Sequence, residues 1–206
     1  MGHVVLLGDS IFDNARYVPG EPDVVEQLRG ELPAGWKATL LAIDGAVTSG
    51  VAKQLSRRPR DATHLVVSVG GNDALGASPI LGARVGSVAE AVAMLAQAQD
   101  AFAVAYGKML AAVLGAGLST ALCTIYDTPS TAPDQRIVRT ALAVFNDVIS
   151  RAAFSHRLAL IDLRLICNED GDYANPIEPS AKGGGKIAAA IARFASGDAG
   201  STVVAH

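Results

Sequence analysis

The chain has 206 residues, of which 50% are hydrophobic and 18% charged, and its formal net charge is −3. This length suffices for one sizeable core, and the composition is typical of a sheet buried on both faces, so we expect a single domain over residues 1–206. The lack of a basic tract argues against nucleic acid as a partner. The sequence lacks a leader-like start and any apolar run of the roughly 18 residues that span a bilayer, which predicts a cytoplasmic protein without a membrane partner.

Strand and helix patterns alternate along the chain. Short apolar runs predict five strands, at residues 4–7, 39–43, 65–69, 119–125 and 158–163. Helices are predicted near residues 23–29, 49–55, 85–115, 134–154 and 185–195, and Gly107 is a candidate break in the third of them. Strands separated by helices predict an α/β fold, a three-layer, parallel, doubly wound sheet with flavodoxin-like layering.

The first predicted strand ends in Gly8-Asp9-Ser10-Ile11, which places Ser10 at the carboxyl edge of the sheet. Open α/β sheets bind their ligands at this edge, where backbone N–H groups can hold negative charge. Ser10 is therefore a candidate nucleophile, although a serine at this kind of turn is more commonly a helix N-cap. Taken alone, Gly45 after the second strand predicts an ordinary turn, and Asn72 after the third predicts an Asx-turn.

Together these segments resemble the SGNH hydrolases, also called GDSL-type esterases and lipases. The shared pattern is Gly-Asp-Ser-Ile, a turn glycine and Gly-x-Asn-Asp, each after a predicted strand. The resemblance implies that Ser10 is the nucleophile. It also implies that the N–H groups of Ser10 and Gly45 and the side-chain amide of Asn72 stabilise an oxyanion. The implied reaction is hydrolysis of a small-molecule carboxylic ester through an acyl-enzyme.

The fourth block of the family departs from its pattern here. It ordinarily reads Asp-x-x-His-Pro, whereas this chain has Asn175-Pro176-Ile177-Glu178-Pro179. Glu178 thus stands where the family has its general base, which makes it a candidate nonstandard base in an atypical triad. We expect nearby carboxylates either to raise its pKa by like-charge repulsion or to orient it. These carboxylates are Glu169, Asp170 and Asp172.

The four histidines of the chain are poor candidates for that base. His3, His64 and His156 precede or open predicted strands, so we expect them at the opposite, amino edge of the sheet as capping or surface residues. His206 is the last residue and would need a folded-back tail.

Two other functions remain open on the sequence. One is a ligand-binding protein with an impaired SGNH site, and the other is an acyltransferase that uses the same serine. The sequence predicts no metal site and no organic cofactor. Cys123 and Cys167 are expected to be buried free thiols, and the oligomeric state is not predicted. The loops 74–87 and 126–133 either shape the pocket or are plain connections. Asp13, Asn14 and Arg16 either face the cleft or, as is more common, lie on a solvated first helical turn.

Overall fold

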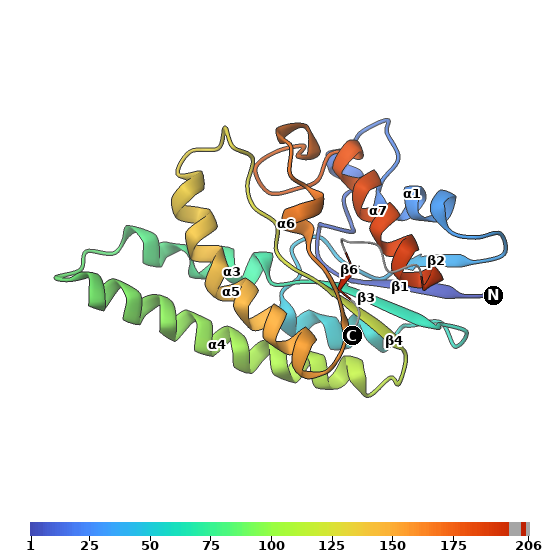
Figure 1. Cartoon of the computed structure of the whole chain (residues 1–206), viewed down its shortest axis with the longest axis horizontal. Coiled ribbons are helices and arrows are strands. Elements are labelled where there is room, and N and C mark those ends of the chain that lie inside the picture. Colours follow the sequence, from blue (N-terminus) through green and yellow to red (C-terminus); the bar gives the residue numbers. More distant parts are fainter. Residues whose placement is uncertain (198–202, 205–206) are drawn as a thin grey trace.

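The computed structural model describes residues 1–197 and 203–204. Its centre is a sheet with the strand order β2-β1-β3-β4-β5-β6 (Figure 1). The strands from β2 to β5 in that order run parallel, and β6 at the edge runs antiparallel to β5. In chain order the strands are β1 (His3–Gly8), β2 (Lys37–Leu40), β3 (His64–Ser68), β4 (Ser119–Cys123), β5 (Ala159–Ile161) and β6 (Val203–Val204).

Helices cover both faces of this sheet. α1 and α7 lie on one face, and α4 and α5 lie on the other (Figure 1). The helices are α1 (Val24–Glu31), α2 (Val51–Leu55), α3 (Gly71–Ala77), α4 (Val88–Leu114), α5 (Gln135–Ser155), α6 (Leu163–Ile166) and α7 (Ala181–Ser196). A 3₁₀ turn, η3 (Ser78–Gly82), follows α3 directly. This arrangement confirms the predicted parallel α/β sheet.

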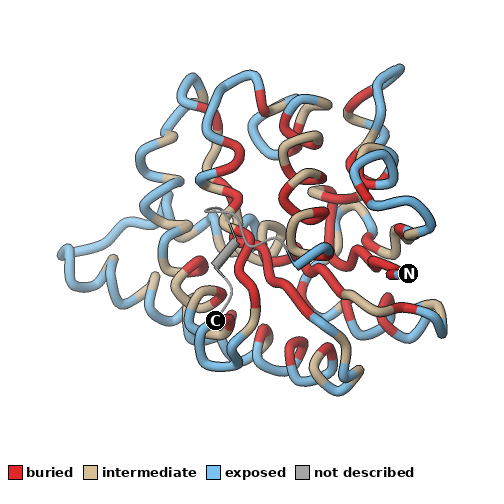
Figure 2. Tube along the Cα trace, turned by 45° about the vertical axis from the view of Figure 1, so that its right-hand side comes forward, coloured by how far each residue is buried: buried red, intermediate tan, exposed pale blue. Residues whose placement is uncertain are grey.

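The side chains of β1 alternate between two hydrophobic cores. Val4 and Leu6 pack into the core beneath α1 and α7, whereas Val5 and Leu7 pack into the core beneath α2, α4 and α5. Alternation follows from the period of two along a strand, and both faces are apolar because both are covered. Figure 2 shows the strands as the most deeply buried part of the trace. Because the strand side chains are packed on both faces, the positions of the strand ends at the carboxyl edge are fixed.

Three details of the prediction are wrong. The segment 74–87 is not one loop, because α3 and η3 occupy it up to Gly82. Gly107 does not break α4, since an exposed glycine costs only about 1 kcal/mol there and the neighbouring Tyr106 and Leu110 are buried against the sheet. The prediction also lacks β6, because a strand of two residues is too short to produce a periodic pattern.

None of the helices in the described residues is long and apolar enough to cross a membrane.

Candidate active site

The turn that carries Ser10 is built by close contact between β1 and β3. Gly8 has φ of +129°, and a Cβ there would lie 1.7 Å from the carbonyl oxygen of Ser68, so only glycine fits. The N–H of Asp9 donates to that same oxygen at 3.1 Å. The buried side chain of Gln54 accepts from the Gly8 N–H and donates to the Gly8 carbonyl, both at 2.8 Å. Ser10 is therefore held rigidly at the carboxyl edge, as predicted.

Ser10 itself is left without partners. Its side chain is largely buried, and in the described part of the chain neither its hydroxyl nor its N–H makes a hydrogen bond. A polar group withdrawn from water ordinarily finds a partner, because leaving it unpaired costs about 1–3 kcal/mol. Ser10 instead lines a cavity and faces the space that a ligand would fill.

Asp9 is a buried titratable group beside Ser10. Its Oδ1 accepts from the N–H of Ile11 at 3.2 Å, and its side chain lines the same cavity. The pKa of Asp9 is raised to about 7, mainly by burial, with smaller contributions from the negative charges of Asp73 and Glu178 and an opposing one from the bond to the Ile11 N–H. Nothing in the Gly-Asp-Ser block of the sequence reveals that the carboxyl group of Asp9 is desolvated.

Asn72 and the turn of Gly45 are joined by one hydrogen bond. The Nδ2 of Asn72, in α3, donates to the carbonyl of Ala46 at 3.0 Å. A side-chain amide carries two N–H donors, so this bond orients the amide and leaves its second N–H for a ligand. Gly45 has φ of +78°, and its own N–H makes no hydrogen bond within the described residues. Asn72 lines the cavity with Ser10, whereas Gly45 is exposed and lies outside the lining.

Glu178 lies in a tight turn after α6. The Oδ1 of Asn175 accepts from the N–H groups of Ile177 and Glu178, and the carbonyl of Glu178 accepts from the N–H of Ala174 at 2.9 Å. The residue is 8% exposed, and no group in the described residues bonds to its carboxylate. Glu178 is not among the described residues that line the cavity with Ser10, and its turn is linked to the segment after Ser10 through the Pro179 carbonyl, which accepts from Asn14.

None of the three neighbouring carboxylates orients Glu178 through a hydrogen bond, because each is bound elsewhere. Glu169 binds the ammonium groups of Lys182 and Lys186, and Asp170 accepts from the N–H and hydroxyl of Ser130 at 2.7 Å each. Asp172 is fully buried and pairs with Lys186 at 2.7 Å. Glu169 and Asp172 thus tie the loop to the lysines of α7, and Asp170 ties it to the segment that contains Ser130.

Asn14 connects the two halves of the site. Its Nδ2 donates to the carbonyl of Pro179 at 3.2 Å, and its Oδ1 accepts from the N–H of Val24 at 3.0 Å. Asn14 is completely buried, so its predicted place on a solvated turn is wrong. By contrast, Arg16 forms an exposed pair with Asp44, and Asp13 accepts from the Asp44 N–H. Asn14 thus fixes the segment after Ser10 against the residue that follows Glu178, a link that only the fold reveals.

The histidines lie away from this site. His3 and His64 begin β1 and β3, and exposed His156 follows α5 before β5, which confirms their expected place at the amino edge. His3 is nevertheless buried, not at the surface, and bonds to Asp61 and Thr39. His206 lies outside the described residues. Cys123 and Cys167 are buried free thiols, as predicted, and the described residues contain no cluster of three or more potential metal ligands.

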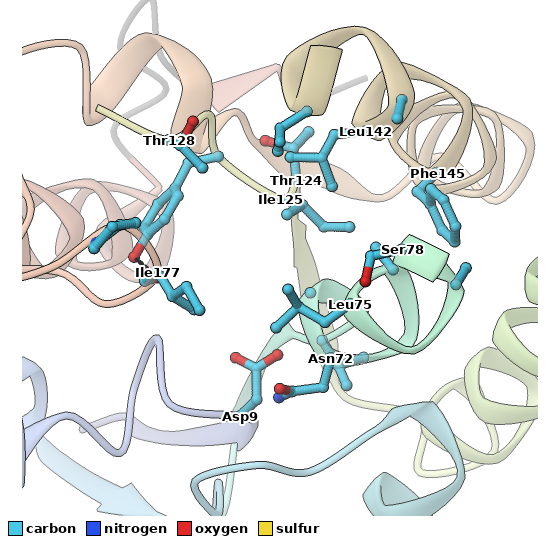
Figure 3. A pocket seen from close by; sticks show the side chains of 18 of the residues that line it. Asp9, Asn72, Leu75, Ser78, Thr124, Ile125, Thr128, Leu142, Phe145 and Ile177 are labelled. Carbon is cyan, nitrogen blue, oxygen red and sulfur yellow. Dashed lines mark hydrogen bonds between the residues drawn. The ribbon is translucent and has the colours of Figure 1, made fainter. Parts of the chain in front are cut away.

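A mainly apolar cavity of about 160 Å³ extends from Ser10 between α3, η3, α4 and α5. In Figure 3, Asp9 and Asn72 lie at one side of it, and Leu142 and Phe145 of α5 lie across from them. Ile177 and Tyr126 form the wall nearest Glu178, joined by a hydrogen bond from the Tyr126 hydroxyl to the Ile177 carbonyl. Segments of both predicted loops, 74–87 and 126–133, contribute lining residues, which confirms that they shape the pocket.

Comparisons with known proteins give a family match and several matches to solved structures. The GDSL-like Lipase/Acylhydrolase family model matches residues 6–184. Comparison with curated proteins gives no significant match. A lipase from a goat rumen metagenome, Lip_vut3, superposes with a TM-score of 0.72 at 16% identity, over 94% of this chain and 97% of that one.

Two further solved structures share the fold. Phospholipase A1 from Streptomyces albidoflavus gives a TM-score of 0.66 at 18% identity, over 96% of this chain and 99% of that one. An acetyl xylan esterase from Geobacillus stearothermophilus, the Axe2 W215I variant, gives 0.68 at 17% identity, over 94% of each chain. Identities this low establish the shared fold and leave the substrate to be argued from the site.

Proposed function

Because this chain belongs to the GDSL-like lipase/acylhydrolase family, we propose that it hydrolyses carboxylic esters through an acyl-enzyme on Ser10, with Glu178 as the general base. The observation that carries the proposal is that two largely buried polar groups, on segments joined by a hydrogen bond, are both free of hydrogen bonds within the described residues, including one to each other. The Ser10 hydroxyl and the Glu178 carboxylate lack hydrogen-bond partners among the described residues, and Asn14 ties their segments together. Such a hydroxyl and base are what nucleophilic catalysis requires.

In the proposed reaction, the Oγ of Ser10 attacks the ester carbonyl carbon while Glu178 takes the hydroxyl proton. The negative oxygen that forms accepts hydrogen bonds from the N–H groups of Ser10 and Gly45 and from the second N–H of Asn72. The bond to the alcohol then breaks, and the proton passes from Glu178 to the leaving oxygen. Water repeats the sequence on the acyl-enzyme and releases the acid.

The test is a pH-rate profile for p-nitrophenyl acetate with Ser10→Ala and Glu178→Gln. We expect Ser10→Ala to lower turnover by ~1,000-fold or more and Glu178→Gln to abolish the Ser10-dependent rate. A glutamate ordinarily titrates about two pH units below a histidine, so the wild-type rate should persist below pH 6. Glu169→Gln is the matched control, since this carboxylate is exposed and bound to lysines.

Two results would contradict the proposal. An acid limb between pH 6 and 7 that is unchanged in Glu178→Gln would exclude Glu178 as the base. A complete lack of Ser10-dependent turnover at any pH would favour a ligand-binding protein on the same fold. Transfer to an added alcohol in competition with water would instead indicate an acyltransferase that uses the same acyl-enzyme.

A further inference from the structure

The cavity beside Ser10 is apolar over most of its wall, with Ser78, Thr124 and Thr128 as polar lining residues away from Ser10. The polar lining includes Asp9, Ser10 and Asn72, and the rest is dominated by aliphatic and aromatic carbon. Among the described residues that line the cavity there is no lysine, arginine or histidine. Buried apolar walls favour hydrocarbon, and a site without a cationic side chain offers nothing to pair with a carboxylate or phosphate. The occupant indicated by this chemistry is a neutral hydrocarbon chain.

The apolar wall is formed where two helices pack together. Ala98 lies one turn before Phe102 in α4, and Ala141 lies one turn before Phe145 in α5. The two phenylalanine rings contact each other, with centroids 5.1 Å apart. One turn earlier, Ala98 and Ala141 both line the cavity, and their side chains are too short to fill the space between α4 and α5. The space that the alanines leave is therefore part of the cavity.

This wall is held in place by polar contacts on the neighbouring turn. The Nε2 of Gln99 donates to the carbonyl of Val144 at 3.1 Å and to the carboxylate of Asp147 at 3.2 Å. On the other side of α5, the side-chain amide of Asn146 bonds to both the N–H and the carbonyl of Ile125, at 2.8 Å each. Ile125 also lines the cavity. The helices and the end of β4 are thus pinned around a preformed space.

We propose that this cavity binds the acyl chain of a medium-chain ester, about six carbons long, and that Ala98 and Ala141 set its depth. The proposal rests on the ester hydrolysis proposed above. An apolar cavity of about 150 Å³ accommodates benzene, a molecule of six carbons, which is the basis for the length given. The acyl chain is chosen over the alcohol because it stays on Ser10 through both steps, so its burial is retained until the acid is released.

The first experiment compares kcat/KM of the wild-type protein for p-nitrophenyl acetate, butyrate, hexanoate and octanoate. Each buried methylene should raise kcat/KM about fourfold, so hexanoate should exceed acetate by about 250-fold, with no further gain beyond the filled cavity. Methyl, butyl and hexyl acetate form the matching series in the alcohol. If kcat/KM rises with each methylene of the alcohol and does not change along the acyl series, the assignment to the acyl chain is overturned.

The second experiment fills the cavity. Ala141→Phe should lower kcat/KM for hexanoate at least tenfold and leave that for acetate within twofold. Ala143→Phe is the matched control, because this alanine is exposed on the same helix. Ala98→Phe in α4, with exposed Ala96→Phe as its control, repeats the test if Ala141→Phe does not fold. An equal loss for both esters, or a wild-type preference for acetate, would overturn the proposal while leaving ester hydrolysis intact.

Binding provides a readout that does not need turnover. Methyl hexanoate, a neutral ester with a six-carbon acyl chain, should raise the melting temperature of Ser10→Ala and should not raise that of Ser10→Ala combined with Ala141→Phe. If no ester is hydrolysed but this difference is observed, the proposed function fails and the chain-binding cavity stands. If methyl hexanoate has no effect on Ser10→Ala and no ester is hydrolysed, both proposals fail.

Discussion

The polar groups at the two edges of the sheet differ in whether they have hydrogen-bond partners. At the amino edge, His3 bonds to Asp61 and Thr39, and Asp61 also binds Lys37. At the carboxyl edge, the hydroxyl of Ser10 has no partner in the described residues, and the carboxyl group of Asp9 is buried. The amino edge is thus satisfied internally, whereas the carboxyl edge retains unused donors and acceptors. Unused polar groups in a rigid frame are typical of a site that awaits a ligand.

The largest expected effect concerns the side-chain amide of Asn72, whose second N–H is free to donate to a ligand. Asn72→Ala should lower kcat for p-nitrophenyl acetate by ~100 to 1,000-fold, because loss of one oxyanion donor costs about that much. KM should change little, since the interaction strengthens in the transition state. Steady-state kinetics measure both. A kcat within fivefold of wild type would mean that Asn72 serves only the bond to Ala46.

Asp9 should make the carboxyl edge a source of pH-dependent instability. Its pKa is raised from 3.8 to about 7 in the folded chain, so between these values the folded state keeps a proton that the unfolded state has lost. The free energy of unfolding should therefore fall as pH rises from 4 to 7, by up to ~4 kcal/mol from this group.

Asp9→Asn should flatten that fall, since the amide cannot ionise. Urea unfolding at pH 4, 5.5 and 7.5 measures it, and Asp13→Asn controls for removal of a neighbouring carboxylate. An unchanged slope in Asp9→Asn would mean that Asp9 is already ionised in the folded chain at pH 5.

A smaller effect is expected from the frame behind Ser10. Gln54→Leu removes both side-chain bonds to Gly8, and we expect it to lower the free energy of unfolding by about 1–3 kcal/mol and to reduce kcat with it. Lys53→Leu, at the adjacent exposed position, should do neither. Equal stability of Gln54→Leu and wild type in urea would show that Gly8 holds its conformation unaided.

The smallest effect is expected at the amino edge. Hydrogen bonds from Lys37 and His3 lower the pKa of Asp61 to about 2, so Asp61 stabilises the fold above pH 4 and this contribution is lost as pH falls toward 2. Asp61→Asn should melt below wild type at pH 7 and match it near pH 2, with ester hydrolysis within twofold throughout. A larger loss of hydrolysis would show that the two edges are coupled.

The sequence alone determined the layers of the fold and the positions of Ser10 and Asn72 at strand ends. Buried parallel strands are continuous apolar runs, and glycine-rich turns end them, so β1 and β3 are readable without a structure. It also located the departure at Glu178. What it could not supply were the partners of each polar group, because a partner distant in sequence leaves no local pattern.

Tertiary structure decided those partners. It bound Glu169, Asp170 and Asp172 to lysines and to Ser130, and left Glu178 unpaired. It buried Asn14 against Pro179 and Asp9 beneath the cavity, which is why the pKa of Asp9 departs from its ordinary value. It also brought Ala98 and Ala141 to one seam, 43 positions apart in sequence. Desolvation and cavity shape depend on which segments meet, and that is decided only when the chain packs.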